Sequence, residues 1–333
     1  MDDKALLVRW RDEPGMRLAA RVIDRIQTGQ PLGDLPVGQH GGRTDLRGFA
    51  APDRDVVPTG RVTDEQDEAG LASRLSGGKV GFHGVTLADL DLTGARLESL
   101  RFFDTTLRNC RFDNARCQDW SGWNLTVEDC SFNLAHLRGS ALGTWYQGRG
   151  NHFHRVDFSG ADLREISCQA ASFSDCDFTD ARLETVEFGA CEFVRCRFGG
   201  LLDEVRFRAE PSGGVDTSAR GRLEEVDFSA AILRWVEFRG LSLDQVQLPP
   251  EGDEHVLVQN YPQVVRHMVD LLADDHTSEI RRLRSRMQVE LKRLDDNRDV
   301  GLWHRDELGE TPQQQHQAYT LLHRAERDCS RST

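Results

Sequence analysis

Hydrophobic residues recur at every fifth position over most of the chain between residues 80 and 250. Leucine or phenylalanine occupies most of these positions, and a small, β-branched or cysteine residue stands two places before it. The other positions of each unit are mainly polar, charged or glycine. A period of five fits neither the 3.6-residue period of a helix nor the two-residue period of a flat strand. The pattern therefore indicates an internal repeat.

The repeat units resemble those of the pentapeptide-repeat proteins. Close matches are residues 160–164 (Gly-Ala-Asp-Leu-Arg), 175–179 (Asp-Cys-Asp-Phe-Thr) and 180–184 (Asp-Ala-Arg-Leu-Glu). The resemblance covers about half of the chain. It implies an all-β core folded as a right-handed, four-sided parallel β-helix with one repeat per side and about twenty residues per coil.

In such a coil, the large and the small position of each unit both point inward and fill a narrow column. The predicted core of the most regular run consists of Phe158, Leu163, Phe173, Phe178, Leu183, Phe188, Phe193 and Phe198, with Cys176 and Cys196 at the small position. Residues twenty apart should stack, which places opposite charges above one another, as in Arg164 over Glu184. Each coil buries its edges only against its neighbours, so both ends need caps.

The pattern divides the chain into four parts. Residues 1–51 are expected to form a helix and a cap for the first coil, and 52–79, rich in Pro, Gly, Asp and Glu, a linker or surface excursion. Residues 80–250 are the β-helix, interrupted by loops at 143–152 and 208–222. Residues 251–333 are expected to form a C-terminal helical arm.

Three helices are predicted in this arm. The first, 261–273, is apolar on one side and is the expected lid of the last coil; the third spans about 314–327. The second, about 277–295, has an apolar seam and an opposite basic face. The seam is Ile280, Leu283, Met287, Leu291 and Leu294, and the basic face is Arg281, Arg282, Arg284, Arg286, Lys292 and Arg293. The helix either packs with a solvated basic face or forms a coiled-coil-like contact, including a homodimer.

Candidate binding residues lie outside the regular pattern or on its acidic surface. Trp145, Tyr146 and Arg149 are of types enriched in binding hot spots, although aromatic residues in a loop can also simply pack over a bulge. Trp235 occupies an outward position that the C-terminal arm is expected to cover. Asp157 and Asp177 are candidates on the acidic surface.

Charge and composition narrow the functions further. Net charge is −13, of which residues 80–250 carry −8, so direct nucleic-acid binding through phosphates is not expected. Seven of the eight cysteines fall at inward positions and are expected to be buried thiols. The pair His152 and His154 lacks further ligands, so we predict no metal site. We also predict no cofactor and no membrane span, and a cytoplasmic location.

No nucleophile, acid–base pair or cofactor motif can be assembled from these residues, so an enzyme is not expected. The favoured interpretation is a protein-interaction scaffold, which is the usual role of a solenoid. The family resemblance implies an alternative, because some pentapeptide-repeat proteins are similar to a DNA duplex in width and charge. Such members bind DNA gyrase or topoisomerase IV and protect it from quinolones or toxins.

Overall fold

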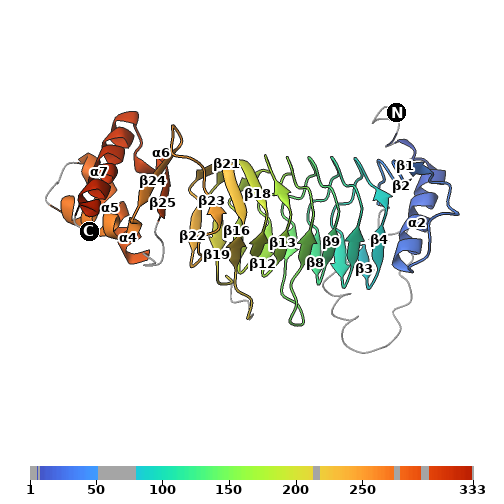
Figure 1. The fold of residues 1–333 in the computed structure, drawn as a ribbon. Helices are drawn as coiled ribbons and strands as arrows, with labels where there is room; N and C mark the ends of the chain where they lie inside the picture. The colour runs from blue at the N-terminus through green and yellow to red at the C-terminus, as the bar shows by residue number, and fades with distance from the viewer. Residues whose placement is uncertain are drawn as a thin grey trace.

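The protein is an elongated rod with a helix at its N-terminal end and a separate α/β domain at its C-terminal end (Figure 1). The computed structural model describes residues 6, 8–51, 80–212, 218–273, 278–293 and 300–331. The predicted linker 52–79 lies outside the described residues.

The rod is a parallel β-helix with four faces. Face 1 is the eight-stranded sheet, face 2 the seven-stranded sheet, and faces 3 and 4 are built partly from short strands and partly from single parallel bridges. Neighbouring strands are one coil apart: Phe82 pairs with Phe102 on face 1 and Leu87 with Leu107 on face 2. With strands about 4.8 Å apart, eight stacked coils give a rod of ~34 Å.

The strands are short because the chain turns every five residues. Face 1 contains β3 (Gly81–His83), β6 (Arg101–Phe103), β8 (Ser121–Trp123), β10 (Ala141–Gly143), β12 (Ser167–Gln169), β16 (Glu187–Gly189), β19 (Arg206–Arg208) and β22 (Glu237–Arg239). Face 2 contains β4 (Thr86–Ala88), β7 (Thr106–Arg108), β9 (Thr126–Glu128), β11 (His152–His154), β13 (Ser172–Ser174), β17 (Glu192–Val194) and β20 (Arg222–Glu224).

Face 3 begins with β1 (Gln39–His40) and β2 (Arg43–Asp45), continues through β5 (Leu90–Asp91) and β14 (Asp177–Phe178), and ends at β23 (Val246–Gln247). Face 4 contains β15 (Leu183–Glu184). The longer strands β18 (Arg197–Asp203) and β21 (Val226–Arg234) bend round the corner and belong to both faces.

The corners explain why polar residues follow each large one. The second residue after the inward side chain has positive φ at many corners, for example Asp89, Asn109, Asn114 and Asp129. Asn, Asp and Gly adopt this left-handed conformation at lower cost than other residues. A turn at every fifth residue therefore follows from the unit itself.

The core is a set of stacked phenyl rings. Phe158, Phe178 and Phe198 stack at centroid distances of 5.1 and 4.7 Å, and Phe173 stacks on Phe193 at 4.9 Å. All ten predicted core residues are at most 2% exposed. The seven inward cysteines are buried free thiols, and burial raises the pKa of Cys117.

In one unit the large position is occupied by Gly122, and a tryptophan two places earlier points into the core. Trp120 is buried at the small position of that side, with its ring centroid 4.9 Å from that of Phe102 and 5.4 Å from that of Phe112. The space next to Gly122 itself is taken by Leu125 and by the Asn151 side chain. Trp120 thus fills part of the core near Gly122, and the loop adds a second contribution through Asn151.

Two insertions leave the rod at the corner between faces 1 and 2. Val127 pairs with Phe153, 26 residues on, because residues 144–151 form a protruding loop. Phe193 pairs with Leu223, 30 residues on, because of the second loop after β19. The parallel register continues beyond both insertions, so each inserted loop lies outside the stack of coils.

The N-terminal cap is tied to the first coil. Helix α2 (Glu13–Gln27) begins after Asp12, whose side chain accepts the Gly15 N–H. Trp10 is buried and donates its indole N–H to Arg47 O at 2.9 Å. Since β2 pairs with β5, residues 43–50 also supply part of the first coil as well as a cover for it.

The C-terminal region is a mixed domain rather than a purely helical arm. Strands β24 (His255–Gln259) and β25 (Val300–His304) pair antiparallel, beside α4 (Tyr261–Leu271), α5 (Ser278–Arg293), α6 (Arg305–Leu308) and α7 (Pro312–Ser330). The ribbon was not predicted, because its two strands are separated by forty residues of mainly helical sequence. The domain has its own hydrophobic core.

The lid predicted for the last coil is wrong, whereas the second helix takes the packed one of its two predicted arrangements. Helix α4 packs mainly on α5 and α7, while β25 contacts β21 and Leu302 reaches the rod core, so the ribbon caps the last coil. The seam residues Ile280, Leu283 and Met287 of α5 are buried within the domain. A homodimer would therefore need another surface, and it remains a prediction.

Candidate interaction surfaces

The loop at 143–152 is a tight hairpin. Tyr146 and Arg149 each donate a backbone N–H to the other's carbonyl, at 2.8 and 2.9 Å. The two residues between them, Gln147 and Gly148, both have positive φ, as a type I′ turn requires. Trp145 and Tyr146 are half-buried and Arg149 is exposed.

A buried amide holds this hairpin on the rod. Asn151 is 0% exposed, and its Oδ1 accepts the Leu125 N–H at 2.9 Å. Its Nδ2 donates to Gly122 O at 3.0 Å and to Leu142 O at 2.8 Å. The side chain thus bonds Leu142, just before the hairpin, and two main-chain groups of the preceding coil. Sequence reasoning missed this residue; the only signal was a polar residue just before the repeat resumes.

Next to the hairpin, face 1 carries a ladder of aromatic side chains. His83, Phe103 and Trp123 stack on successive coils with centroid distances of 4.7 and 4.4 Å and nearly parallel planes. Burial lowers the pKa of His83. The ladder ends one coil before β10, from which the hairpin emerges.

The predicted acidic residues Asp157 and Asp177 are neighbours on face 3, where they form a parallel bridge. Each carboxylate is oriented by the residue two places on. Asp157 accepts the N–H of Ser159 at 2.8 Å, and Asp177 accepts the N–H of Thr179 at 2.8 Å. Neither is brought close to the hairpin, because they lie on a different face.

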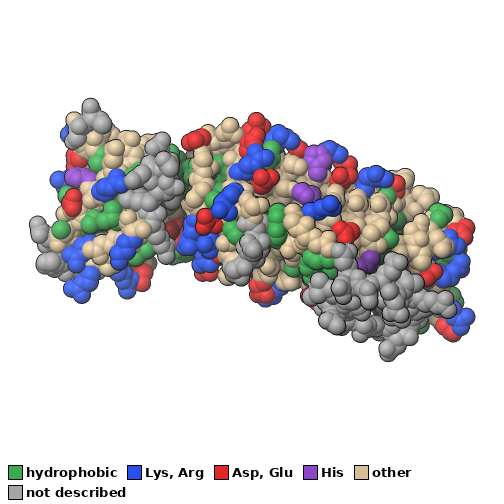
Figure 2. Space-filling model, turned by 90° about the horizontal axis from the view of Figure 1, so that it is seen from below, with side chains coloured by type: hydrophobic (Ala, Val, Ile, Leu, Met, Phe, Trp, Pro, Cys, Tyr) green, Lys and Arg blue, Asp and Glu red, His purple; other side chains and the backbone are tan. Residues whose placement is uncertain are grey.

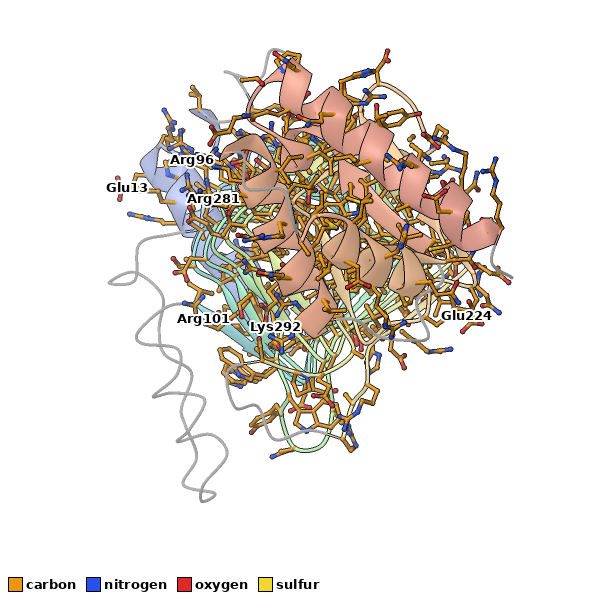
Figure 3. All side chains as sticks on the ribbon, turned by 90° about the vertical axis from the view of Figure 1, so that its left-hand side faces the viewer. Glu13, Arg96, Arg101, Glu224, Arg281 and Lys292 are labelled. Atoms are coloured by element: carbon orange, nitrogen blue, oxygen red, sulfur yellow. The ribbon has the colours of Figure 1, made fainter. Side chains whose placement is uncertain are left out.

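Charge is unevenly distributed around the rod. From residue 81 onward, the three outward positions of the strand- or bridge-forming units on faces 2 and 3 carry thirteen acidic side chains and six arginines, whereas those on faces 1 and 4 are nearly balanced. The acidic residues are Asp89, Asp91, Asp113, Glu128, Asp129, Asp157, Asp175, Asp177, Asp180, Glu192, Glu224, Glu225 and Asp227, and the arginines are Arg108, Arg111, Arg155, Arg195, Arg197 and Arg222. In the view along the rod, Glu224 lies across from Arg96 and Arg101 (Figure 3).

Even so, both signs occur along the rod, as the space-filling view shows (Figure 2). Of the predicted charge columns, Arg195 contacts Asp175 at 2.7 Å and Arg164 approaches Glu184 at 3.9 Å. Asp162 instead pairs with Arg164, two residues on, at 2.7 Å. Surface pairs of this kind each contribute little to stability.

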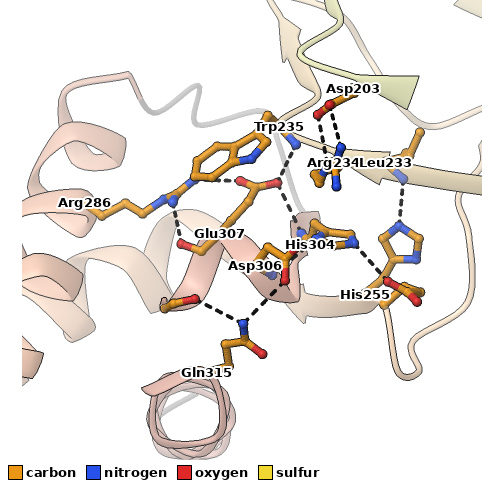
Figure 4. Close-up of polar contacts among 12 residues, drawn as sticks. Asp203, Leu233, Arg234, Trp235, His255, Arg286, His304, Asp306, Glu307 and Gln315 are labelled. Carbon is orange, nitrogen blue, oxygen red and sulfur yellow. Dashed lines mark hydrogen bonds and ion pairs between the residues drawn. The ribbon is translucent and has the colours of Figure 1, made fainter. Parts of the chain in front are cut away.

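Trp235 lies at the joint between the rod and the C-terminal domain (Figure 4). Its backbone N–H donates to Glu307 Oε1 at 3.0 Å, and the Arg286 guanidinium lies 4.6 Å from the centroid of its ring. The same guanidinium lies 4.9 Å from the Trp303 ring and pairs with Glu307 at 2.7 Å. The C-terminal domain therefore contacts Trp235 as expected, but leaves the residue 42% exposed.

Arg286 was expected on the solvated basic face of α5, and the structure corrects this. Its side chain turns into the joint, where burial lowers its pKa and raises that of Glu307. Arg281 and Arg282, on the same helix, are exposed. A cavity of about 780 Å³ adjoins Arg286, between the last coil and the domain, with Val236, Phe238 and Leu302 among its lining residues.

Within the described residues, no three His, Cys, Asp or Glu side chains gather as metal ligands would. His152 and His154 instead contact Ser172 and Ser174, at 2.6 and 2.8 Å. None of the described helices has the length and apolar character needed to span a bilayer.

The comparisons with known proteins concern the repeat. The family model for pentapeptide repeats matches residues 152–189 with eight copies. A search of curated proteins returned no match. A trypsin-treated form of QnrB1, described as a plasmid-mediated fluoroquinolone resistance protein, is similar at 17% identity and a TM-score of 0.28, covering 51% of this chain and 78% of that chain.

Another similar structure is HetL, described as a pentapeptide repeat protein involved in heterocyst differentiation regulation, from the cyanobacterium Nostoc sp. strain PCC 7120. It shares 15% identity at a TM-score of 0.19, covering 55% of this chain and 93% of that chain. The five-residue pattern, the four-faced coil and the family match over residues 152–189 together identify the chain as a pentapeptide-repeat protein.

Proposed function

We propose that the protein is a non-catalytic interaction scaffold that engages a partner protein through the hairpin at 143–152. The observation that carries this proposal is the way the hairpin is held. A type I′ turn and the buried Asn151 fix its backbone, so that Trp145, Tyr146 and Arg149 are presented at little further entropic cost on binding. Aromatic and arginine side chains on a rigid support are frequent anchors of interfaces.

Site-specific photo-crosslinking tests the proposal. A photoreactive residue at the exposed Gln147 should capture a discrete partner in cells. The double variant Trp145→Ala/Tyr146→Ala, with the photoreactive residue retained, should lose that adduct. A matched control, His152→Gln on face 2, should keep it. Equal crosslinking of the same protein by all variants would show that the hairpin side chains do not select the partner.

The charge distribution favours a second candidate. Because the negative excess of the rod lies on faces 2 and 3, those faces would suit a positively charged groove that otherwise holds DNA, such as that of a type II topoisomerase. Supercoiling by gyrase, with protein titrated in and with or without a quinolone, tests this role. Inhibition or drug protection should weaken in Asp157→Asn/Asp177→Asn and persist in Glu98→Gln/Glu184→Gln on face 4. No effect of the unaltered protein would exclude gyrase as the partner.

A further inference from the structure

Two buried histidines lie where the rod joins the C-terminal domain (Figure 4). His255 is 4% exposed and His304 5%, and their ring centroids are 5.9 Å apart. One hydrogen bond between the two parts of the molecule is made by His255, whose Nε2 accepts the backbone N–H of Leu233 at 2.9 Å. Leu233 belongs to β21 of the rod and His255 to β24 of the domain.

These hydrogen bonds define the protonation states of both rings. A nitrogen that accepts an N–H must have its lone pair free, so His255 is neutral with its proton on Nδ1. His304 Nδ1 accepts the Asp306 N–H at 3.2 Å, and its Nε2 therefore donates to Glu254 at 3.0 Å. A proton added to His255 Nε2 would set two N–H groups against each other, and the bond to Leu233 would be lost.

The charged groups around His255 come from every neighbouring element. Arg234, beside Leu233, is held by Asp203 at 2.6 Å. Glu254 precedes His255, and His304, Arg305, Asp306 and Glu307 follow on β25 and α6, with Arg286 on α5 beyond them. No carboxylate among the described residues hydrogen-bonds to His255, so only the charge of the neighbouring Glu254 compensates a positive charge on its ring.

We propose that His255 is a proton-sensitive latch between the rod and the C-terminal domain, closed while its imidazole is neutral and released when it is protonated. Release would separate β24 and β25 from the last coils and open the neighbouring apolar surface of Val236 and Phe238 to solvent. The proposal does not depend on the function assigned to the hairpin.

The electrostatics support this direction. Burial, and secondarily the positive charge that a protonated His304 would carry, lower the pKa of His255 from 6.5 to about 4, although Glu254 acts in the opposite sense. The closed state therefore binds its proton less readily than the open state, and acid favours opening between about pH 6.5 and 4. Glu307 opposes this effect, because burial raises its pKa and its protonation favours the closed state. Only the His255 shift is large.

Native-state hydrogen exchange of the whole protein tests the latch at two amides. Exchange of the Leu233 amide, corrected for the intrinsic pH dependence, reports the opening equilibrium. We expect this equilibrium constant to rise about 70-fold between pH 7.5 and 4.5, from the two pKa values for His255. The backbone N–H of Trp235 donates to Glu307, and its exchange should rise together with that of Leu233 if the whole joint opens. The Glu237 amide, bonded to Val205 O within the rod, is the internal control.

Variants separate the latch from general acid instability. In His255→Gln the amide oxygen can still accept the Leu233 N–H but does not titrate, so the rise should vanish. His152→Gln, on the rod surface, should behave as the unaltered protein. If His255→Gln does not fold, Glu307→Gln keeps the proposal testable. Because the titration of Glu307 opposes opening in acid, its removal should increase the rise of the opening equilibrium constant between pH 7.5 and 4.5. A change under 3-fold in the unaltered protein, the same rise in His255→Gln, or a Trp235 amide that does not respond would each overturn the proposal.

Discussion

Replacement of Asn151 by alanine should destabilise the rod and loosen the hairpin together. The asparagine amide satisfies three main-chain groups of the surrounding coils, and the alanine variant leaves all three without it. Each buried group left without a partner costs roughly 1–3 kcal/mol. A water molecule entering the vacated space would recover part of that cost, so we expect a loss of about 3–5 kcal/mol in the free energy of unfolding.

Urea unfolding followed by circular dichroism measures this loss, and hydrogen exchange at Tyr146 and Arg149 reports on the hairpin. Asn133→Ala is the matched control, because Asn133 is only half-buried and its side chain donates one bond, to Ser159 Oγ at 2.8 Å. It should lose under about 1 kcal/mol. A loss below about 1 kcal/mol in Asn151→Ala, or unchanged protection of the hairpin amides, would refute the reasoning.

Asn151→Asp is a more specific test, because the side chain keeps its shape and only the donating Nδ2 group is replaced, by an oxygen. At neutral pH its second oxygen faces the carbonyls of Gly122 and Leu142, so the variant should be less stable than the unaltered protein by several kcal/mol. Protonation of the new carboxyl restores one donor, and stability relative to the unaltered protein should partly recover as the pH falls from neutral toward about 4.

Three further predictions concern the core, the joint and the N-terminal cap. Phe178→Ala should cost about 3–5 kcal/mol in urea unfolding, because its ring stacks within an otherwise filled column. Arg286→Ala should speed exchange of the Trp235 amide at the joint, whereas Arg281→Ala, an exposed control on the same helix, should not. At Asp45, burial acts to raise the pKa, but hydrogen bonds from Arg47 outweigh it and lower the pKa to about 2. Its contribution of roughly 1–2 kcal/mol is present above pH 3.8 and is lost as the pH falls toward 2, a dependence absent from Asp45→Asn in acid titrations of stability.

The rod could be predicted from sequence because its information is local. Each five-residue unit specifies its own inward side chains, and the corner that follows favours Asn, Asp or Gly, so repetition fixes the fold without knowledge of distant contacts. Helices 13–27, 261–271 and 278–293 were predicted for a similar reason, since each has an apolar face at helical spacing.

The elements that escaped prediction all depend on pairing between distant residues. Strand β24 is a short apolar run, and only its partnership with β25, across two helices, makes it a strand. Arg286 differs from Arg281 in sequence by nothing but position, and it is buried because Trp235 and Trp303 converge on it. Asn151 stands at the small position two places before Phe153, but nothing in the sequence indicates that its amide would bond three main-chain groups at once.

Because residues one coil apart pair regularly, the number of coils fixes distances along the rod. The hairpin leaves at β10 and the C-terminal domain joins at β21, so the number of coils between them sets the distance from one to the other. Adding or removing one coil of about twenty residues would shift that distance by about 4.8 Å while leaving every pairing intact. A chain of this design can therefore change the spacing of its two attachments in fixed steps, without redesigning either of them.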